Sequence, residues 1–142
     1  MDICLRKQLI VTTCSGWIRI WNYHTKTMEN EKKCAAGEEA TAVAIHPSGF
    51  HIVVAFIDKV VFMNVFSPEI KEYSPSTVLS IKGCKELKFS NGGHMIAAGN
   101  TNGQIHVYNF YTLECMLTLL GHNNKIRCID WKEDDTGFAS CG

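Results

Sequence analysis

The sequence lacks an excess of charge of either sign. Its 142 residues carry 14 Lys and Arg against 14 Asp and Glu, so the formal net charge is zero. Nucleic-acid-binding proteins usually carry a basic patch, because contacts with phosphates supply much of their affinity. The composition therefore disfavours a nucleic-acid partner.

Long apolar runs are also missing. The longest, Ile52–Ile57, is far shorter than the roughly 20 residues that a membrane-spanning helix needs. The start of the sequence contains Arg6 and Lys7 and continues with only three apolar residues, which is not the pattern of a signal peptide. We expect no membrane partner.

Closely spaced cysteines are absent as well. The seven cysteines form no C-x-x-C pair, and most of them lie inside apolar runs, where a thiol packs as a small hydrophobic group. This usage indicates a reducing, intracellular compartment. Zinc sites normally need paired ligands at short spacing, so we expect the six histidines to be structural and predict no metal or other cofactor.

Catalytic motifs are equally scarce. There is no G-x-S-x-G sequence around a nucleophile, and Gly99–Gly103 joins two strands without the helix that a phosphate cradle requires. Asp134 and Asp135 are adjacent carboxylates, but they occupy a turn that we expect to be solvated. The sequence predicts a protein that is not an enzyme.

A repeat with a period of about 44 residues is present instead. Ile18–Tyr23, Val60–Val65 and Ile105–Phe110 resemble one another. A second series has the same period and consists of Ile45–Gly49, Phe89–Gly93 and Trp131–Asp135. Repeats of this length that contain several short strands are typical of β-propeller blades.

Runs of β-branched and aromatic residues between turn residues predict the strands. The expected strands are Thr41–His46, Phe50–Ile57, Lys59–Val65, Lys85–Ser90, His94–Gly99 and Gln104–Phe110. The run Ile52–Ile57 is apolar continuously, so both of its faces should be covered. Met28–Lys33 is almost entirely polar, which suits an outermost strand. No helical periodicity is evident, and the predicted fold is all-β.

The repeat predicts a propeller segment of about two complete four-stranded blades plus two partial ones. The complete blades are expected at residues 41–81 and 85–120, and the partial blades at 8–34 and 125–142. Closed propellers typically use about 4–8 blades, so we expect this segment to pack against the remainder of its own propeller.

These residues resemble the WD-repeat β-propellers, whose blades contain a buried hydrogen-bonded tetrad of His, Ser or Thr, Asp and Trp. Gly121-His122, Ser140, Asp58 and Trp21 match members of that tetrad and its Gly-His dipeptide. Elsewhere Cys84 replaces the His, Ala98 replaces the Ser, and Met63 and Tyr108 replace the Trp. The resemblance therefore implies blades that are held together mainly by apolar packing.

Asp2–Lys7 and Phe89–His94 resemble more closely a ciliary and flagellar group of WD-repeat proteins with coiled-coil tails. That resemblance implies a non-catalytic scaffold in the cytoplasm and the axoneme of the cilium or flagellum. Its implied partners are other proteins, such as inner-arm dyneins and dynein-regulatory components. Two alternatives stay open. One is a WD-repeat scaffold from another complex, such as a ubiquitin-ligase receptor or a ribosome-assembly factor, and the other is an enzyme with an unrecognised site.

In a propeller, the loops that link blades and those that join the middle strands project onto one face. Loops on rigid scaffolds commonly bind partners. The residues predicted to contact a partner protein are Asp58, Lys59, Lys85, Asn102, Asn123, Asn124 and Lys125. Trp17 is a further candidate contact residue, because aromatic side chains are enriched at binding hot spots. Trp21 and Trp131 are expected in the core.

Overall fold

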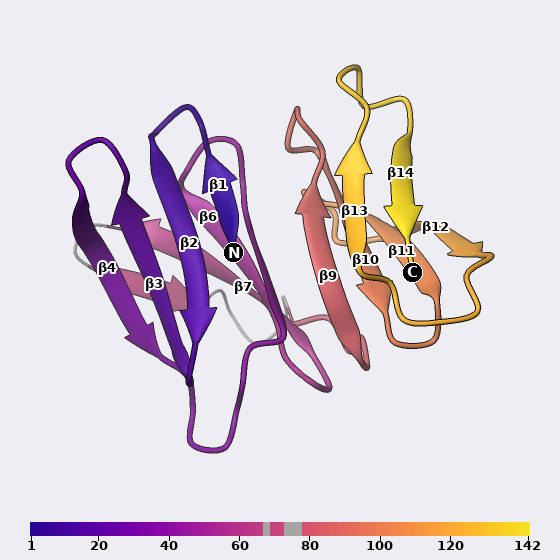
Figure 1. Ribbon diagram of the computed structural model, residues 1–142, viewed down its shortest axis with the longest axis horizontal. Helices are drawn as coiled ribbons and strands as arrows, with labels where there is room; N and C mark the ends of the chain where they lie inside the picture. Colours follow the sequence, from indigo (N-terminus) through magenta and orange to yellow (C-terminus); the bar gives the residue numbers. More distant parts are fainter. Residues whose placement is uncertain (67–68, 73–77) are drawn as a thin grey trace.

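The computed structural model describes residues 1–66, 69–72 and 78–142, and the described residues form antiparallel β-sheets joined by turns (Figure 1). Its strands are β1 (Asp2–Cys4), β2 (Leu9–Cys14), β3 (Trp17–Asn22), β4 (Thr27–Lys33), β5 (Ala42–Ile45), β6 (His51–Ala55), β7 (Val60–Phe66), β8 (Glu69–Glu72), β9 (Cys84–Phe89), β10 (Met95–Asn100), β11 (Gln104–Asn109), β12 (Cys115–Leu120), β13 (Cys128–Trp131) and β14 (Phe138–Cys141).

Each sheet contains consecutive strands in chain order, because short turns join each strand to the next. The first three sheets have four strands each, β1 to β4, β5 to β8 and β9 to β12, and the last described sheet pairs β13 with β14. The predicted all-β fold of four-stranded propeller blades is confirmed. Part of the predicted blade at 41–81, residues 67–68 and 73–77, lies outside the described residues.

The first sheet differs from the expected partial blade at 8–34, because it has a fourth strand nearer the N-terminus. Asp2 pairs with Val11 and Cys4 pairs with Leu9, across a turn that ends at Gln8 with a φ of 57°. The Cys4 side chain is buried, and an Asp2 carboxylate oxygen accepts a hydrogen bond from the Ile45 backbone N–H at 3.0 Å. These contacts with the next sheet stabilise a strand of only three residues.

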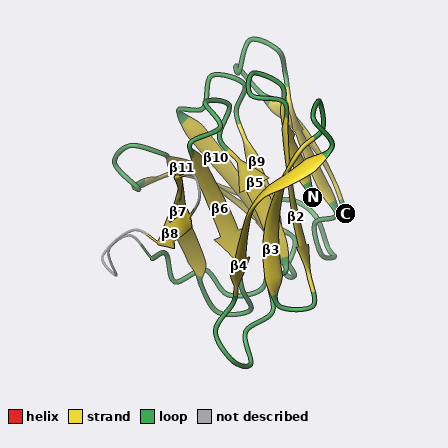
Figure 2. Cartoon of the chain, turned by 90° about the vertical axis from the view of Figure 1, so that its left-hand side faces the viewer, coloured by secondary structure: helices red, strands yellow, loops and turns green. Residues whose placement is uncertain are grey.

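The core lies between successive sheets, which stack face to face (Figures 1 and 2). Strand β6 shows the arrangement most clearly, because Val53 and Val54 are both fully buried but belong to different clusters. Val54 packs in the cluster shared with the first sheet, and Val53 packs in the cluster shared with the third sheet. The prediction that both faces of this strand are covered is confirmed.

The outermost strands of the first and third sheets have opposite characters. Strand β4 is outermost, as predicted, and it exposes charged side chains such as Glu29 and Glu31. Every residue of β12 is also exposed, yet that strand carries no charge and presents Met116 and Leu120 to its surroundings. Charged edges resist pairing with other strands, whereas apolar edges favour it.

One of the three tryptophans lies on a different face from the one expected. Ile18 and Ile20 of β3 are fully buried, so the alternation of the strand turns Trp21 to the opposite face, where it is 38% exposed. The prediction that Trp21 is a core residue is therefore wrong. Trp131 is partly buried and packs against the cluster between the third and last sheets, which agrees with the prediction. Trp17 is half-buried, with Lys33 and Arg19 near its ring.

Candidate functional site

The turns that join the second and third strands of each sheet lie on the same side as the connections between sheets. We call this surface the loop face. Its described parts are the turns at residues 15–16, 56–59 and 101–103 and the connections at residues 34–41, 78–83 and 121–127. It contains the residues that the sequence predicted as partner contacts.

Backbone hydrogen bonds tie neighbouring parts of the loop face together. The Gly83 N–H donates to the Ile57 carbonyl at 2.8 Å, and the Thr101 N–H donates to the Gly83 carbonyl at 2.9 Å. Further along, the Ile126 N–H donates to the Asn100 carbonyl at 3.1 Å. The turns of the second and third sheets are thus fixed to the connections that follow them, so the face is a continuous structure and not a set of independent loops.

One position of the loop face requires glycine. Gly103 has a φ of 79°, and a Cβ added there would lie 2.1 Å from the His122 carbonyl oxygen. That separation is far inside van der Waals contact, and the neighbouring atom belongs to the backbone. The close approach brings the turn at 101–103 against the connection at 121–127, and so places Asn102 near Asn123 and Asn124.

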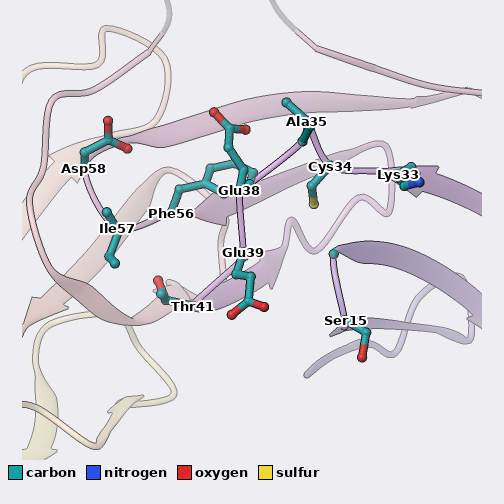
Figure 3. Close-up of a pocket in the computed structure, with 13 residues that line it drawn as sticks. Ser15, Lys33, Cys34, Ala35, Glu38, Glu39, Thr41, Phe56, Ile57 and Asp58 are labelled. Atoms are coloured by element: carbon teal, nitrogen blue, oxygen red, sulfur yellow. The ribbon is translucent and has the colours of Figure 1, made fainter.

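A hollow of about 640 Å³ opens on the loop face between the first and second sheets (Figure 3). The turn at Ser15 and Gly16, the connection at residues 34–41 and the turn at residues 56–58 line it. Acidic side chains predominate: Glu38 and Glu39 project from the connection and Asp58 from the turn, with Lys33 at the end of β4 as the basic member.

A charge pair stabilises this hollow. Lys59 Nζ contacts Glu38 Oε1, and both side chains are about one-third exposed. The Thr41 hydroxyl donates to the Cys84 carbonyl at 2.6 Å, which fixes the end of the same connection to β9. Because Lys59 is engaged by Glu38, the unpaired charges at the surface of the hollow belong mainly to its other acidic residues.

The opposite end of the loop face has a basic character. A second hollow, of about 500 Å³, is lined by Thr101, Asn124, Lys125, Arg127 and Gly142. Lys125 and Arg127 are both exposed. The loop face therefore runs from an acidic end beside the first sheet to a basic end beside the last one.

The structure places all seven predicted contact residues on or beside this face. Asp58, Asn102, Asn123, Asn124 and Lys125 are exposed in its turns and connections, and Lys85 is exposed at the second residue of β9. Lys59 is half-buried in its pair with Glu38. Whether these residues bind a partner stays a prediction.

Glu38 and Glu39 were not among the contact residues predicted from the sequence. The available signal was the segment that contains them, since Ala35, Ala36 and Gly37 are small residues followed by two acids between two predicted strands. Gly37 has a φ of 83°, so the connection turns sharply there and presents the acids that follow.

On the other side of the molecule, Asp135 does not have the solvated environment that the sequence predicted. Its carboxylate accepts hydrogen bonds from the Asn91 and Gly92 backbone N–H groups, both at 2.7 Å, and its side chain is only 11% exposed. Burial acts to raise the pKa of Asp135, but these hydrogen bonds outweigh it and hold the pKa below its ordinary value. Asp134 remains exposed.

The described residues offer no obvious site for metal chemistry. No group of three or more His, Cys, Asp or Glu side chains among them is placed to hold a metal ion. None of the seven cysteines, all of which lie within the described residues, forms a disulfide. In the part of the chain that the structure describes, no helix has the length and apolar character needed to span a membrane.

Comparisons with known proteins converge on one type of fold. Residues 73–134 match the family model described as the anaphase-promoting complex subunit 4 WD40 domain. The β-propeller domain of Cps50 (Swd1) from Myceliophteria thermophila superposes with a TM-score of 0.79 at 14% identity, covering 98% of this chain and 47% of that one.

Similar sequences include two ciliary proteins. Cilia- and flagella-associated protein 57 A of Tetrahymena thermophila is 46% identical over 97% of this chain, and cilia- and flagella-associated protein 57 of Mus musculus is 45% identical over all of it. The chain spans 10% and 11% of these two relatives. WD repeat-containing protein 1 of Gallus gallus is 32% identical over 81% of this chain, which covers 20% of that protein.

Proposed function

Because this chain is a segment of a WD-repeat β-propeller, we propose that it is part of a non-catalytic scaffold that binds other proteins through its loop face. The observation that carries the proposal is the set of backbone hydrogen bonds across the loop face. One series joins Ile57, Gly83 and Thr101, and another bond joins Asn100 and Ile126. A face fixed in this way can hold exposed side chains in one geometry, which lowers the entropy lost on binding.

The charges of the loop face supply a basis for specificity. Glu39 and Asp58 lie at its acidic end, and Lys125 and Arg127 lie at its basic end. A partner with charges of the opposite order would be oriented as it approached, because complementary charges raise association rates and fix register. The proposed contact residues Lys85, Asn102, Asn123 and Asn124 lie on or beside this face, and Lys59 supports it through Glu38.

We place this scaffold in the axoneme of the cilium or flagellum. Support comes from the similarity, over 97% and 100% of this chain, to proteins named as cilia- and flagella-associated, at 46% and 45% identity. The resemblance of Asp2–Lys7 and Phe89–His94 to the ciliary group supports the same location. On that resemblance, the partners are inner-arm dyneins and their regulatory components.

A second candidate function is a scaffold in a different intracellular complex. The match of residues 73–134 to a WD40 domain of the anaphase-promoting complex and the similarity to WD repeat-containing protein 1 favour it. Both candidates use the loop face to bind proteins, and they differ in the location of the protein in the cell.

The first test is the location of the tagged full-length protein in ciliated cells. An axonemal scaffold should be distributed along the cilium and remain with the axoneme after detergent removes the membrane. A full-length protein that is confined to the nucleus or the cell body would contradict the ciliary proposal, while leaving the binding role of the loop face open to the second test.

The second test reverses charges on the loop face of the full-length protein. Asp58→Lys and Lys125→Glu should each weaken the recovery of bound partners several-fold, because both side chains are exposed at opposite ends of the face. Glu133→Lys and Lys26→Glu are matched controls, since these exposed residues lie in turns on the opposite side. Unchanged recovery with the loop-face variants, or equal losses with the controls, would contradict docking at this face.

A further inference from the structure

The chain contains two Asn-Gly dipeptides, and the structure gives them opposite surroundings. Asn91-Gly92 lies in the turn between β9 and β10, on the side away from the loop face, and Asn102-Gly103 lies in the turn between β10 and β11 on the loop face. Both asparagines are exposed. They therefore form a matched pair within one protein, with the same dipeptide in the same sheet.

Asn-Gly dipeptides are prone to a defined reaction. The backbone nitrogen of the glycine attacks the side-chain amide carbon of the asparagine, the C–N bond to the amide nitrogen breaks, and ammonia leaves to give a five-membered succinimide. Water then opens the ring at either carbonyl and leaves aspartate or isoaspartate. Glycine favours the attack because it has no Cβ to obstruct it, and asparagine is among the thermally labile residues.

Hydrogen bonds to Asp135 oppose this reaction at Asn91. The attacking atom would be the Gly92 nitrogen, whose N–H donates to Asp135 Oδ2 at 2.7 Å. The Asn91 side-chain amide donates to the Lys132 carbonyl at 2.8 Å and to Asp135 Oδ1 at 2.9 Å. Attack requires loss of the proton from that N–H and rotation of that amide. The carboxylate stabilises the proton on the N–H and disfavours new negative charge nearby.

Asn102 has no comparable restraint. Among the described residues its side chain makes no hydrogen bond, and the Gly103 N–H makes only a long one, of 3.4 Å, to the Asn100 carbonyl. The backbone of the turn is nevertheless fixed, because Asn100 Oδ1 accepts hydrogen bonds from the Asn102 and Gln104 N–H groups at 2.9 and 3.0 Å. The side chain is therefore able to rotate towards a nitrogen that is weakly held.

We propose that Asn102 is a site of spontaneous deamidation in the folded protein, and that Asn91 is protected by the carboxylate of Asp135. Conversion of Asn102 adds a negative charge to the loop face. The isoaspartate product also inserts an additional backbone carbon into the turn at 101–103, which is hydrogen-bonded to Gly83 on one side and packed against His122 on the other.

The chemistry of this proposal is independent of the docking function, and only its effect on partner binding rests on that proposed function. If the loop face binds a partner, Asn102→Asp should weaken recovery of that partner, and conversion to isoaspartate should weaken it more because the turn itself is distorted. A normal interaction of Asn102→Asp would leave the deamidation result intact and count against the docking role of this residue.

The experiment follows both sites in the intact full-length protein. The folded protein is incubated at mildly alkaline pH in water labelled with heavy oxygen, digested at intervals, and analysed by mass spectrometry for label in the peptides that contain residues 91 and 102. We expect conversion at Asn102 to be about ten- to a hundredfold faster than at Asn91, because hydrogen bonds to an ionised group must be lost at Asn91 before attack. In denaturant the two rates should converge.

Asp135→Asn provides the sharpest variant, because it keeps the shape of the side chain and removes the charge. It should accelerate conversion at Asn91 and leave the rate at Asn102 unchanged. Asp134→Asn is the matched control, since within the described part of the chain Asp134 bonds only inside its own turn, to Lys132 and Thr136. Equal rates at the two sites in the folded protein, absence of conversion at Asn102, or no acceleration at Asn91 with Asp135→Asn would each overturn the proposal.

Discussion

The third sheet and the last sheet have different residues at equivalent positions of the repeat. In the third sheet the second strand holds Ala98, which is almost completely buried in the apolar cluster shared with the second sheet, together with Cys84 of β9. In the last sheet the position equivalent to Ala98 holds Ser140, and His122 Nε2 lies 2.9 Å from the Ser140 hydroxyl oxygen, within hydrogen-bonding distance. One repeat therefore has a small apolar residue where another has a hydroxyl that pairs with a histidine.

The first sheet keeps the other half of the polar arrangement. Trp21 Nε1 donates to the Thr12 hydroxyl at 3.1 Å, and Thr12 lies on the second strand at the position equivalent to Ser140. The tetrad of the WD-repeat family is thus divided in this segment. A Trp–Thr pair remains in the first sheet and a His–Ser pair in the last one, and neither pair occurs among the described residues of the middle sheets.

The difference shows that the polar tetrad is replaceable where apolar packing is complete. Burial raises the pKa of the Cys84 thiol to about 12, so it remains a neutral group among apolar neighbours. A polar residue at such a position would need a partner, because a buried hydroxyl without a hydrogen bond is destabilising. The cores of the middle sheets therefore depend on close apolar packing at these positions, and should tolerate polarity least there.

The largest expected loss of stability comes from a charge placed in the apolar core of the middle sheets. Val54→Asp places a carboxylate where the side chain is fully buried between the first and second sheets, and should cost about 3–5 kcal/mol of unfolding free energy. Chemical denaturation and the soluble yield of the full-length protein measure it. Ile57→Asp is the control, because Ile57 is 75% exposed just beyond the same strand and should change stability little. Similar stability of the two variants would mean that β6 is not a core strand.

An intermediate effect on stability is expected when a hydroxyl is added to an apolar sheet or removed from the sheet that has the His–Ser pair. Ala98→Ser adds a hydroxyl at a position that is almost completely buried in the apolar cluster, and should destabilise by about 1–3 kcal/mol. Ser140→Ala removes the partner of His122 in a less buried setting and should cost about 1 kcal/mol. Denaturation of the two variants in parallel ranks these costs. If Ser140→Ala is the more damaging, polar pairing contributes more than apolar packing in this segment.

The strand pattern of the segment was predictable from the sequence. The orientation of some side chains was also predictable, but the alternation that shows it was overlooked. Turn residues and β-branched runs identified β5 to β7 and β9 to β11. The ends of these strands differ from the predicted ends by up to about two residues, because hydrogen bonding, and not residue type, determines where a strand ends. The alternation of Ile18 and Ile20 also contained the information that Trp21 faces away from the core. Thr12 was identifiable too, because it lies one repeat period before Val54.

Contacts between sheets were beyond sequence reasoning. The pairing of Glu38 with Lys59 and of Asp135 with Gly92 joins segments whose separation along the chain does not specify which side chains meet. Strand β1 was missed for the same reason, because three residues carry little pattern and their stability comes from contacts such as the one from Asp2 to Ile45. The predicted loop face followed from topology alone, whereas its division into acidic and basic ends required the structure.

The smallest expected effect is a pH-dependent change in stability at one of two contacts that join neighbouring sheets. Both contacts lie on the side away from the loop face. His46 Nε2 lies 3.0 Å from the Gly93 carbonyl, across the interface between the second and third sheets, while Asp135 joins the third and last sheets. His46 Nδ1 accepts from the Ser48 N–H, so the Nε2–H is the donor to Gly93 and the ring is neutral. Burial is the main cause that lowers the pKa of His46, and the nearby His51 and Arg6 lower it further, against the hydrogen bond to Gly93.

The sign of the pH dependence at His46 follows from this direction. Because the folded pKa lies below the ordinary value of about 6.5, the unfolded chain binds the proton first, and stability is lost as the pH falls from about 6.5 towards the folded pKa. The lowered pKa of Asp135 acts in a separate window. Its contribution is complete above the ordinary carboxyl value of about 4 and is lost only as the pH falls below it. Mild acidification should therefore destabilise the packing around His46, because it places a charged ring in a buried site between the second and third sheets, while the contact to the last sheet persists.

Hydrogen exchange in the full-length protein measures this difference, with exchange rates corrected for the intrinsic effect of pH. Between pH 7 and pH 5, peptides around His46 and Gly93 should lose protection, whereas protection of the Gly92 amide should change less because Asp135 stays ionised throughout that range. His46→Gln removes the titrating group and keeps a hydrogen-bond donor, so its protection around Gly93 should no longer depend on pH. An equal loss of protection in that variant would assign the pH dependence to another group and remove the distinction between the two contacts.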